Sequence, residues 1–352
     1  MKIKQHIQAV LGGSEVFTDI MMQSDAPIML KTPRGWMPAA NSEVPTYAEL
    51  QAFLQSLDEN FEAEIVKGEL NRPYVMGETR LRVNAYLASA GERLMLSIRR
   101  IPSVTPSLQE AGLPASMRVI LDNPSGLCLI SGPTGSGKTT TMAAMVDAIN
   151  SMKNAHVVTI EEPIEYVFER KKALFSQREV GVDCDSFRDG VRAAMRQRPD
   201  VIVIGEIRDR ETAEQAFIAG ESGHLVIGTL HASSAVGTVG KILSFFNDNE
   251  RASRLQSLSG SLLAIINQTL IPKRSGDGYA LAVDFIANHK REYSKMLGEP
   301  EAMQNKLDRG DDGLSVSLAT SALKLIQDNV VGKADAVKAV AANAHAYERV
   351  RA

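Results

Sequence analysis

The chain has 352 residues, of which 44% are hydrophobic and 23% are charged, so its composition is that of an ordinary globular protein large enough for two domains. The net charge of −3, with acidic and basic residues interleaved, argues against a broad nucleic-acid-binding surface. Its two cysteines lie outside any Cys-x-x-Cys pair, which excludes a cysteine-only zinc site, and no apolar run reaches the roughly 18 residues that a membrane span needs.

Residues 1–100 combine short strand-like segments with one amphipathic helix. The segments 19–30, 80–86 and 94–99 have strand-like composition and are separated by Gly, Pro and Asn. Apolar residues recur at helical spacing over 48–57. We therefore expect a small domain that mixes strands and helices.

A proline-rich linker is predicted at 101–114. It contains Pro102, Pro106, Gly112 and Pro114. Proline interrupts the hydrogen bonding of both helices and sheets, so regular structure should stop here. This composition predicts a hinge between two rigid bodies.

From residue 115 to residue 352 the pattern changes to apolar strands that alternate with helices. Four continuous apolar runs are typical of interior strands in a parallel sheet covered by helices on both faces: 127–131, 157–160, 201–204 and 225–229. After residue 250 we expect mainly polar helices, with a loop at 310–313.

Residues 132–139, GPTGSGKT, match the phosphate-loop pattern G-x-x-x-x-G-K-[ST] between a predicted strand and a predicted helix. Glycines let successive backbone N–H groups surround phosphate oxygens at a helix N-terminus that favours anions. Lys138 would reach the β- and γ-phosphates, and the Thr139 hydroxyl would ligate Mg²⁺. We therefore expect ATP and Mg²⁺ as cofactors. The candidate nucleotide-binding residues are Gly132, Pro133, Thr134, Gly135, Ser136, Gly137, Lys138, Thr139 and Thr140.

Two later strands end in carboxylates: Glu161, Glu162 and Glu165 after the first, and Glu206 after the second. Ligands of open α/β sheets bind outside the carboxyl ends of the strands, so both clusters would face the γ-phosphate and its metal. A glutamate at this place can orient water or hold Mg²⁺ through its hydration shell, and it can also simply cap a helix.

His231 closes the next strand, where a polar side chain could sense the γ-phosphate. A lone histidine is more often structural, and the residues alone leave both interpretations of His231 open. His224, at the start of the same strand, is expected to be structural.

Four segments, in this order, resemble the four signature boxes of the PilT family of type IV pilus retraction ATPases, within the secretion ATPase superfamily. They are GPTGSGKTT at 132–140 for Walker A, TIEEPIEYVF at 159–168 for the Asp box, RPDVIVIGEIRD at 198–209 for Walker B and GHLVIGTLHA at 223–232 for the His box. The GEIRD and GTLH segments together are far more specific than Walker A. The resemblance implies an α/β fold: a RecA-like P-loop motor domain with a mainly parallel sheet at 115–352, and a smaller N-terminal α+β, PAS-like domain at 1–100.

The resemblance also implies roles for single residues. Glu165 would be the water-activating carboxylate, Glu206 the Walker B carboxylate near Mg²⁺, partly through water, and His231 the functional His-box residue. Family members are similar in placing arginines near the γ-phosphate, where guanidinium groups stabilise the charge of the transferring phosphoryl group. The matching residues are Arg82 and Arg99 in the N-terminal domain and Arg192 and Arg196 in the motor domain.

The chain departs from the family pattern at three places. Glu162 stands where the family has Asp, and Phe168 stands where it has His. The stretch 286–299, IANHKREYSKMLGE, only loosely resembles the family's C-terminal motif that contains Ala-Ile-Arg. The third departure leaves the mechanical output of the motor open, whereas ATP hydrolysis is expected in either case.

The predicted function is a hexameric cytoplasmic motor ATPase that drives type IV pilus retraction at the inner-membrane face. Expected partners are further copies in a homohexamer, an inner-membrane pilus platform protein and a paralogous retraction ATPase, without nucleic acid. The alternatives are an accessory retraction ATPase or an assembly ATPase of a type IV secretion or conjugation system. A nucleic-acid translocase and a scaffold that binds ATP without turnover are weaker alternatives, and a GTPase is disfavoured because no Asn-Lys-x-Asp motif occurs.

Overall fold

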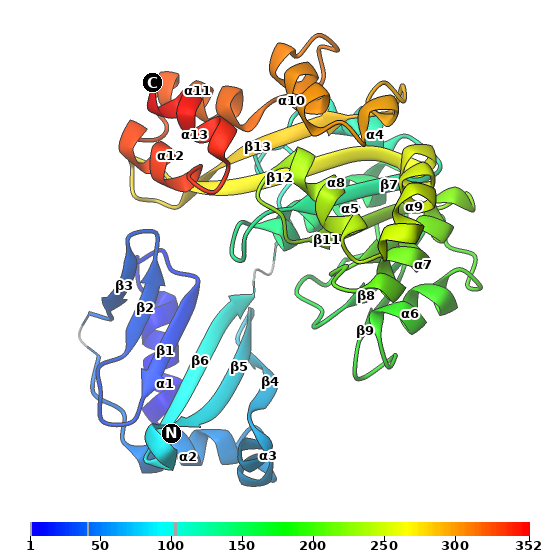
Figure 1. The fold of residues 1–352 in the computed structure, drawn as a ribbon. Coiled ribbons are helices and arrows are strands. Elements are labelled where there is room, and N and C mark those ends of the chain that lie inside the picture. The colour runs from blue at the N-terminus through cyan, green and yellow to red at the C-terminus, as the bar shows by residue number, and fades with distance from the viewer. Residues whose placement is uncertain (1, 41, 102–103) are drawn as a thin grey trace. The chain divides into compact units, whose positions relative to one another are not determined.

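The computed structural model describes residues 2–40, 42–101 and 104–352, and the chain divides into two compact units (Figure 1). Unit 1 comprises residues 1–104 with 276–278, and unit 2 comprises 105–275 and 279–352. The predicted linker at 101–114 includes Pro102 and Ser103, which lie outside the described residues. The rest of the predicted linker, from residue 105, belongs to unit 2, where Leu113 is buried in the hydrophobic core.

Unit 1 is a six-stranded antiparallel sheet in the order β3-β2-β1-β6-β5-β4. Its strands are β1 (Asp19–Gln23), β2 (Met29–Thr32), β3 (Gly35–Pro38), β4 (Leu70–Met76), β5 (Thr79–Ala88) and β6 (Arg93–Ile101), with the 3-10 turn η1 (Ser89–Gly91) between the last two. Its helices are α1 (Lys2–Gly12), α2 (Tyr47–Gln55) and α3 (Phe61–Lys67). Helix α2 begins with a capping box in which Thr46 and Glu49 each accept the other's backbone N–H. Alternate residues of the strands form one core with the apolar residues of the helices, so the unit has its own hydrophobic centre.

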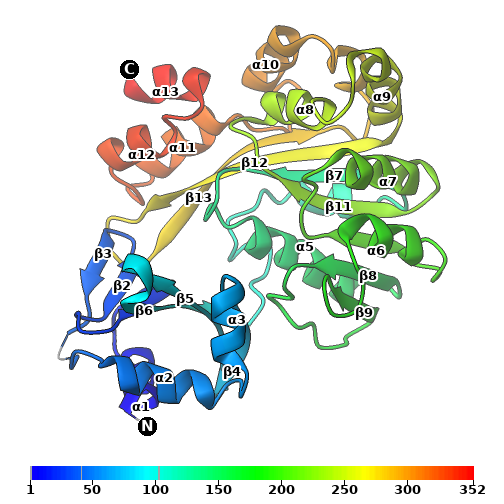
Figure 2. The same cartoon turned by 60° about the horizontal axis from the view of Figure 1, so that its bottom comes forward.

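Unit 2 is built on a seven-stranded sheet in the order β13-β12-β7-β11-β10-β8-β9 (Figure 2). The pairs from β12 to β9 are parallel, and only β12 and β13 run antiparallel. The strands are β7 (Gly126–Ser131), β8 (His156–Glu161), β9 (Leu174–Glu179), β10 (Val201–Ile204), β11 (Leu225–Leu230), β12 (Leu262–Pro272) and β13 (Tyr279–Ala287). This mostly parallel sheet confirms the predicted α/β class.

Helices cover both faces of this sheet because successive strand residues point to opposite sides. Leu127 and Leu129 of β7 belong to the core under one group of helices, and Cys128 and Ile130 belong to the core on the other face. The first group is α6 (Phe187–Ala194), α7 (Arg210–Glu221), α8 (Ala235–Leu243), α9 (Asp248–Ser261) and α10 (Pro300–Arg309). The second is α4 (Met117–Leu121) and α5 (Lys138–Met152).

The prediction of mainly helices after residue 250 is wrong for 262–287, where β12 and β13 form a long antiparallel pair. Its outer part is covered by α11 (Leu318–Gln327), α12 (Lys333–Ala339) and α13 (Ala344–Arg351), which share a core with Ile271 and Ala282. The predicted loop at 310–313 lies between α10 and α11. Apolar residues such as Ile265 and Ile266 are buried on alternate faces, so the continuous apolar run 262–266 belongs to an interior strand.

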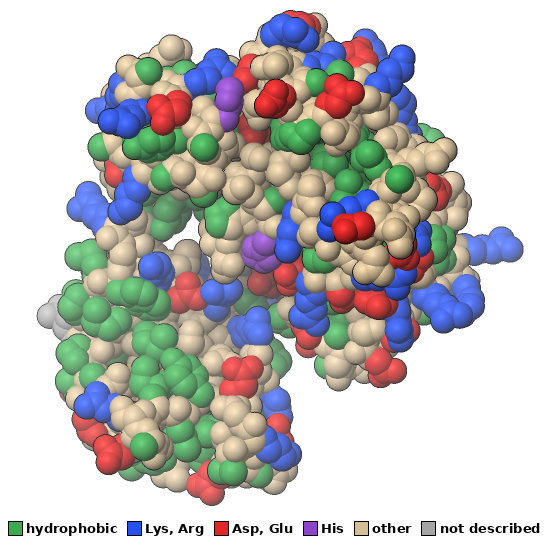
Figure 3. Space-filling view, viewed as in Figure 1, with side chains coloured by type: hydrophobic (Ala, Val, Ile, Leu, Met, Phe, Trp, Pro, Cys, Tyr) green, Lys and Arg blue, Asp and Glu red, His purple; other side chains and the backbone are tan. Residues whose placement is uncertain are grey.

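No helix within the described ranges is long and apolar enough to cross a membrane. On the face shown in Figure 3, Lys and Arg side chains are interleaved with Asp and Glu on unit 2, so that face carries no broad field of one sign.

Candidate active site

The phosphate loop connects the end of β7 at Ser131 to the start of α5 at Lys138. Gly132 has a φ of 147°, and a Cβ atom there would lie 2.5 Å from the main-chain oxygen of Gln268 and 2.6 Å from Ser136 Oγ. Only glycine therefore fits at the point where the chain turns away from the sheet. Ser136 Oγ is buried and has no hydrogen-bond partner in the described structure, which leaves a polar atom inside the loop for a ligand to satisfy.

Lys138 is folded over its own loop. Its Nζ atom donates hydrogen bonds to the carbonyl oxygens of Gly132 and Pro133, both at 3.0 Å, and lies 3.5 Å from Nδ1 of His231. Burial lowers the pKa of the lysine, and the negative charge of Glu206 opposes this effect. The ammonium group of Lys138 therefore lies against the main chain of the phosphate loop.

Glu206 and His231 reach the same place from two neighbouring strands. Glu206 follows β10 and His231 follows β11, and these strands are parallel neighbours in the sheet. His231 Nε2 lies 3.4 Å from a carboxylate oxygen of Glu206. Because an ammonium group can only donate, His231 Nδ1 accepts from Lys138, which leaves the proton on Nε2 facing Glu206. The structure therefore brings together three of the predicted site residues.

The carboxylates at the end of β8 and just after it lie in different environments. Glu161 is 4% exposed, and its carboxylate accepts hydrogen bonds from Thr159 Oγ1 at 2.7 Å and from Gln177 Nε2 at 3.3 Å. Burial raises the pKa of Glu161, and these hydrogen bonds partly offset the rise. Glu162 is exposed and forms an ion pair with Arg208 at 3.0 Å, whereas Glu165 is half-buried.

The four predicted arginines lie in two separate places. Arg82 and Arg99 face each other directly in the β5–β6 register of unit 1. Arg82 donates to Asn71 Oδ1 at 2.9 Å, and Arg99 donates to Asp19 Oδ1 at 2.8 Å. The carboxylate of Asp19 therefore balances the charge of Arg99, which lies opposite the like charge of Arg82. Arg192, on α6, and Arg196, just after it, are both exposed.

The residues present fit a magnesium-bound nucleotide. Mg²⁺ bound with a nucleotide usually takes one or two protein oxygen ligands together with phosphate oxygens and water. The Thr139 hydroxyl and the Glu206 carboxylate offer such oxygens. Within the described residues no group of three or more His, Cys, Asp or Glu side chains could hold a metal alone, so the phosphates would have to complete its coordination.

Sequence reasoning missed two glutamines that contact the site. Gln268 lies on β12 one residue beyond Asn267, the partner of Ser131, and its buried side chain donates to the main-chain oxygen of Ser136 at 2.7 Å. Gln177, on β9, contacts the Asp-box segment. Neither residue belongs to a sequence motif. Their contacts with the site follow from the strand order, which places β12 beside β7 and β9 beside β8.

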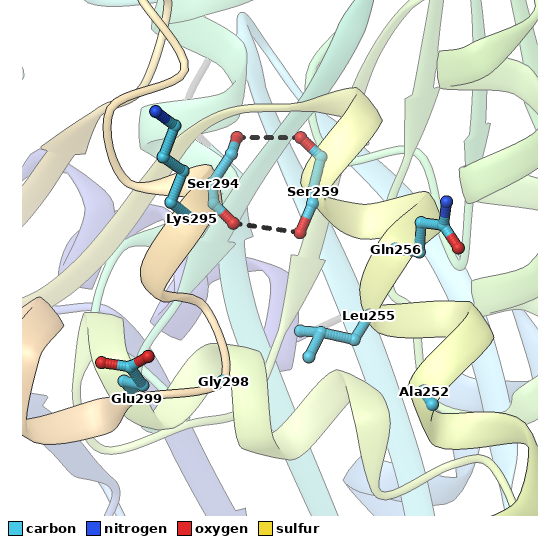
Figure 4. Close-up of a pocket in the computed structure, with 8 residues that line it drawn as sticks. All are labelled: Ala252, Leu255, Gln256, Ser259, Ser294, Lys295, Gly298 and Glu299. Atoms are coloured by element: carbon cyan, nitrogen blue, oxygen red, sulfur yellow. Dashed lines mark hydrogen bonds between the residues drawn. The ribbon is translucent and has the colours of Figure 1, made fainter.

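A separate pocket of about 420 Å³ lies between α9 and the segment around η2 (Ser294–Met296) (Figure 4). Leu255 of α9 borders it, and Ser259 and Ser294 join its two walls through reciprocal hydrogen bonds of 3.1 and 2.8 Å. Part of the stretch 286–299, which departs from the family pattern, thus forms one wall of this pocket.

Residues 69–329 match the family model described as type II/IV secretion system protein. The type IV pilus retraction ATPase PilT of Pseudomonas aeruginosa is 46% identical over 202 residues, which cover 57% of this chain and 58% of that relative. The type IV pilus ATPase PilU of the same organism is 32% identical over 279 residues, which cover 79% of this chain and 72% of PilU. A crystal structure of the pilus retraction motor PilT with bound ADP superposes with a TM-score of 0.82 at 33% identity and covers 96% of both chains. The family and fold predicted from the four boxes are thereby confirmed.

Proposed function

Since this chain belongs to the type II/IV secretion system protein family, we propose that it is a motor ATPase that hydrolyses ATP to drive type IV pilus retraction. The observation that carries the proposal is the convergence of Lys138, Glu206 and His231 beside a phosphate loop at the carboxyl ends of parallel strands. The likeness to a retraction motor that binds ADP supports the choice of nucleotide.

In this proposal each polar group at the strand ends has a separate task. The loop N–H groups and Lys138 would hold the phosphates, and Thr139 and Glu206 would hold Mg²⁺, in part through water. Bound Mg²⁺ supplies charge neutralisation on the phosphates. Glu165 orients and deprotonates the attacking water, and His231 links Lys138 to Glu206 and so reports on the γ-phosphate.

To convert ATP hydrolysis into movement, the proposed motor needs both units of the chain and several copies of the chain. Arg82 and Arg99 of unit 1, and Arg192 and Arg196 of unit 2, would stabilise the charge of the transferring phosphoryl group. We propose that six copies form a ring in the cytoplasm, at the inner-membrane face, where it acts on a pilus platform protein. Within the predicted linker at 101–114, the boundary between the units at residues 104 and 105 would serve as the hinge that opens when phosphate leaves.

Two substitutions and a control test the site. Lys138→Ala should weaken ADP binding at least about tenfold, whereas Glu206→Ala should keep ADP binding and lower turnover at least about a hundredfold. Glu221→Ala, at the exposed end of α7, is the matched control and should leave both unchanged. Phosphate release and calorimetry give the two readouts, and light scattering with an ATP analogue should give the mass of a hexamer. Wild-type turnover in Glu206→Ala would mean that the site is wrongly assigned.

An accessory retraction ATPase or an assembly ATPase of a secretion system is the second candidate. It is favoured by the departure at 286–299 and by the 32% identity to PilU over most of the chain. Cells that carry Glu206→Ala separate the candidates. Complete loss of filament retraction indicates the first function, partial loss of retraction indicates the accessory role, and loss of secretion with normal retraction indicates the assembly role.

A further inference from the structure

Strand β9 lies at the edge of the unit 2 sheet, beside the segment that carries Glu165. Its Gln177 makes three hydrogen bonds there. The side-chain oxygen accepts from the N–H of Phe168 at 3.1 Å, and the side-chain nitrogen donates to the carbonyl oxygen of Tyr166 at 2.7 Å and to Glu161 Oε1 at 3.3 Å. The oxygen and the nitrogen of the Gln177 side-chain amide therefore both form hydrogen bonds with the segment 161–168.

The register of the sheet explains how β9 holds this segment. Thr159 of β8 pairs with Gln177, and Glu161 pairs with Glu179, so residues 177 and 179 share one face of the edge strand. A carboxylate oxygen of Glu179 accepts from the N–H of Ile164 at 3.1 Å. The two side chains thus fix the main chain immediately before Glu165 and one and three residues after it.

The same segment also contacts the helix that follows the phosphate loop. Tyr166 is 4% exposed, and its hydroxyl lies 3.2 Å from Thr140 Oγ1 near the start of α5. The residue next to Glu165 is therefore held by its carbonyl to β9 and by its side chain to the Walker A helix. A continuous set of contacts therefore joins the edge strand to the helix that follows the phosphate loop.

We propose that Gln177 is a positioning residue for hydrolysis, which holds the main chain around Glu165 so that this carboxylate is aimed at the attacking water. The inference rests on the proposed function, in which Glu165 activates water. Among the described residues, the hydrogen bonds of the Gln177 side chain go to Glu161, Tyr166 and Phe168 and not to the phosphate loop, so Gln177 should affect the chemical step and leave nucleotide binding intact. A misplacement of about 1 Å in a catalytic group can cost about a hundredfold in rate.

The test uses two variants of different chemistry in the full chain. Gln177→Glu keeps the shape of the side chain but turns its donor into an oxygen that faces the Tyr166 carbonyl and the Glu161 carboxylate. Gln177→Leu removes donor and acceptor together. For both we expect kcat to fall at least about tenfold, while the KM for ATP and the affinity for ADP change less than about twofold.

Ser176→Ala is the matched control, because Ser176 is the neighbouring residue on the same strand and bonds away from the segment, to His156 Nε2 at 2.9 Å. It should keep the wild-type kcat. Wild-type kcat in both Gln177 variants would overturn the inference. So would a joint loss of kcat and ADP binding, or an equal loss in Ser176→Ala, because either result would indicate general damage to the edge strand.

Glu165→Gln separates this inference from the proposed function. If Glu165→Gln is inactive and the Gln177 variants are fully active, only the positioning role fails. If Glu165→Gln retains wild-type turnover, the assignment of Glu165 fails and the positioning role fails with it.

Discussion

Asp284 of β13 holds a buried carboxylate, 1% exposed, at the beginnings of three helices. It accepts hydrogen bonds from the N–H of Leu318, from the N–H of Ala235 at 3.3 Å and from Asn343 Nδ2 at 3.1 Å. Ala235 opens α8, which follows the His231 loop, whereas Leu318 opens α11 and Asn343 caps α13. One side chain therefore links the start of α8 to the C-terminal helices α11 and α13.

This carboxylate should make the stability of unit 2 depend on pH. Burial raises the pKa of Asp284 to about 6 from 3.8, although its hydrogen bonds oppose the rise. The folded protein therefore favours the protonated form, and the stabilisation is complete below about pH 4 and is lost as the pH rises to about 6. The loss should be on the order of 3 kcal/mol.

Asp284→Asn removes this titration while it keeps the shape of the side chain. Thermal unfolding midpoints at pH 4.5 and pH 7.5 should fall less with pH in the variant than in the wild type, because all other groups are common to both. Parallel pH dependences in the two proteins would contradict the prediction.

Single residues of the candidate site differ in how far the sequence predicts them. Lys138, Glu206 and His231 lie in motifs at strand ends, and parallel strands place their ends at one edge, so their meeting follows from the pattern. Gln177 and Gln268 have no motif, and their contacts depend on which strands are neighbours. Strand order arises from long-range pairing, which local sequence does not specify.

Among the elements, β12 shows why the sequence pattern after residue 250 predicts helices where the structure has strands. The polar, helical sequence of α9 runs directly into the strand, and Gly260, the glycine near this junction, still belongs to the helix. Within β12 the polar pair Asn267-Gln268 interrupts the apolar run, which weakens the strand pattern. These two polar residues are the ones that contact Ser131 and Ser136 around the phosphate loop. The residues that β12 needs for its contacts around the phosphate loop are therefore the ones that weaken its strand pattern in the sequence.

Because β12 braces the phosphate loop through Gln268, Gln268→Met should weaken ADP binding about tenfold. Methionine fills a similar volume but leaves the buried carbonyl of Ser136 without its donor, so the loop loses its fixed shape. Calorimetric titration with ADP measures the effect.

Thr269→Val is the control on the same strand, because the Thr269 hydroxyl donates away from the loop, to the carbonyl oxygen of Ala339 at 3.3 Å. Its ADP affinity should match that of the wild type. An equal loss of affinity in both variants would show that any disturbance of β12 has the same effect.

For the whole molecule, the proposed motor function requires the two units to move relative to each other during the nucleotide cycle. If nucleotide closes the units through Arg82 and Arg99, distances between spin labels at Val66→Cys in unit 1 and Glu221→Cys in unit 2 should differ between the ATP-analogue, ADP and nucleotide-free states. Both positions are exposed, and Cys184→Ser removes the partly accessible native thiol. Identical distances in all three states would rule out the hinge even if ATP were hydrolysed.

The order of the strands has a consequence for how the chain folds. In unit 1 the central pair joins Asp19 to Arg99, 80 residues apart, and in unit 2 the end of β7 joins Ser131 to Asn267, 136 residues apart. Both neighbours of β7, namely β11 and β12, come much later in the chain than β7 itself. Such pairings must first close long loops, which slows folding and leaves strand edges open in the meantime. During synthesis, the hydrogen bond from Gln268 to the phosphate loop can form only after residue 268 has been made. The nucleotide site is therefore completed late in folding.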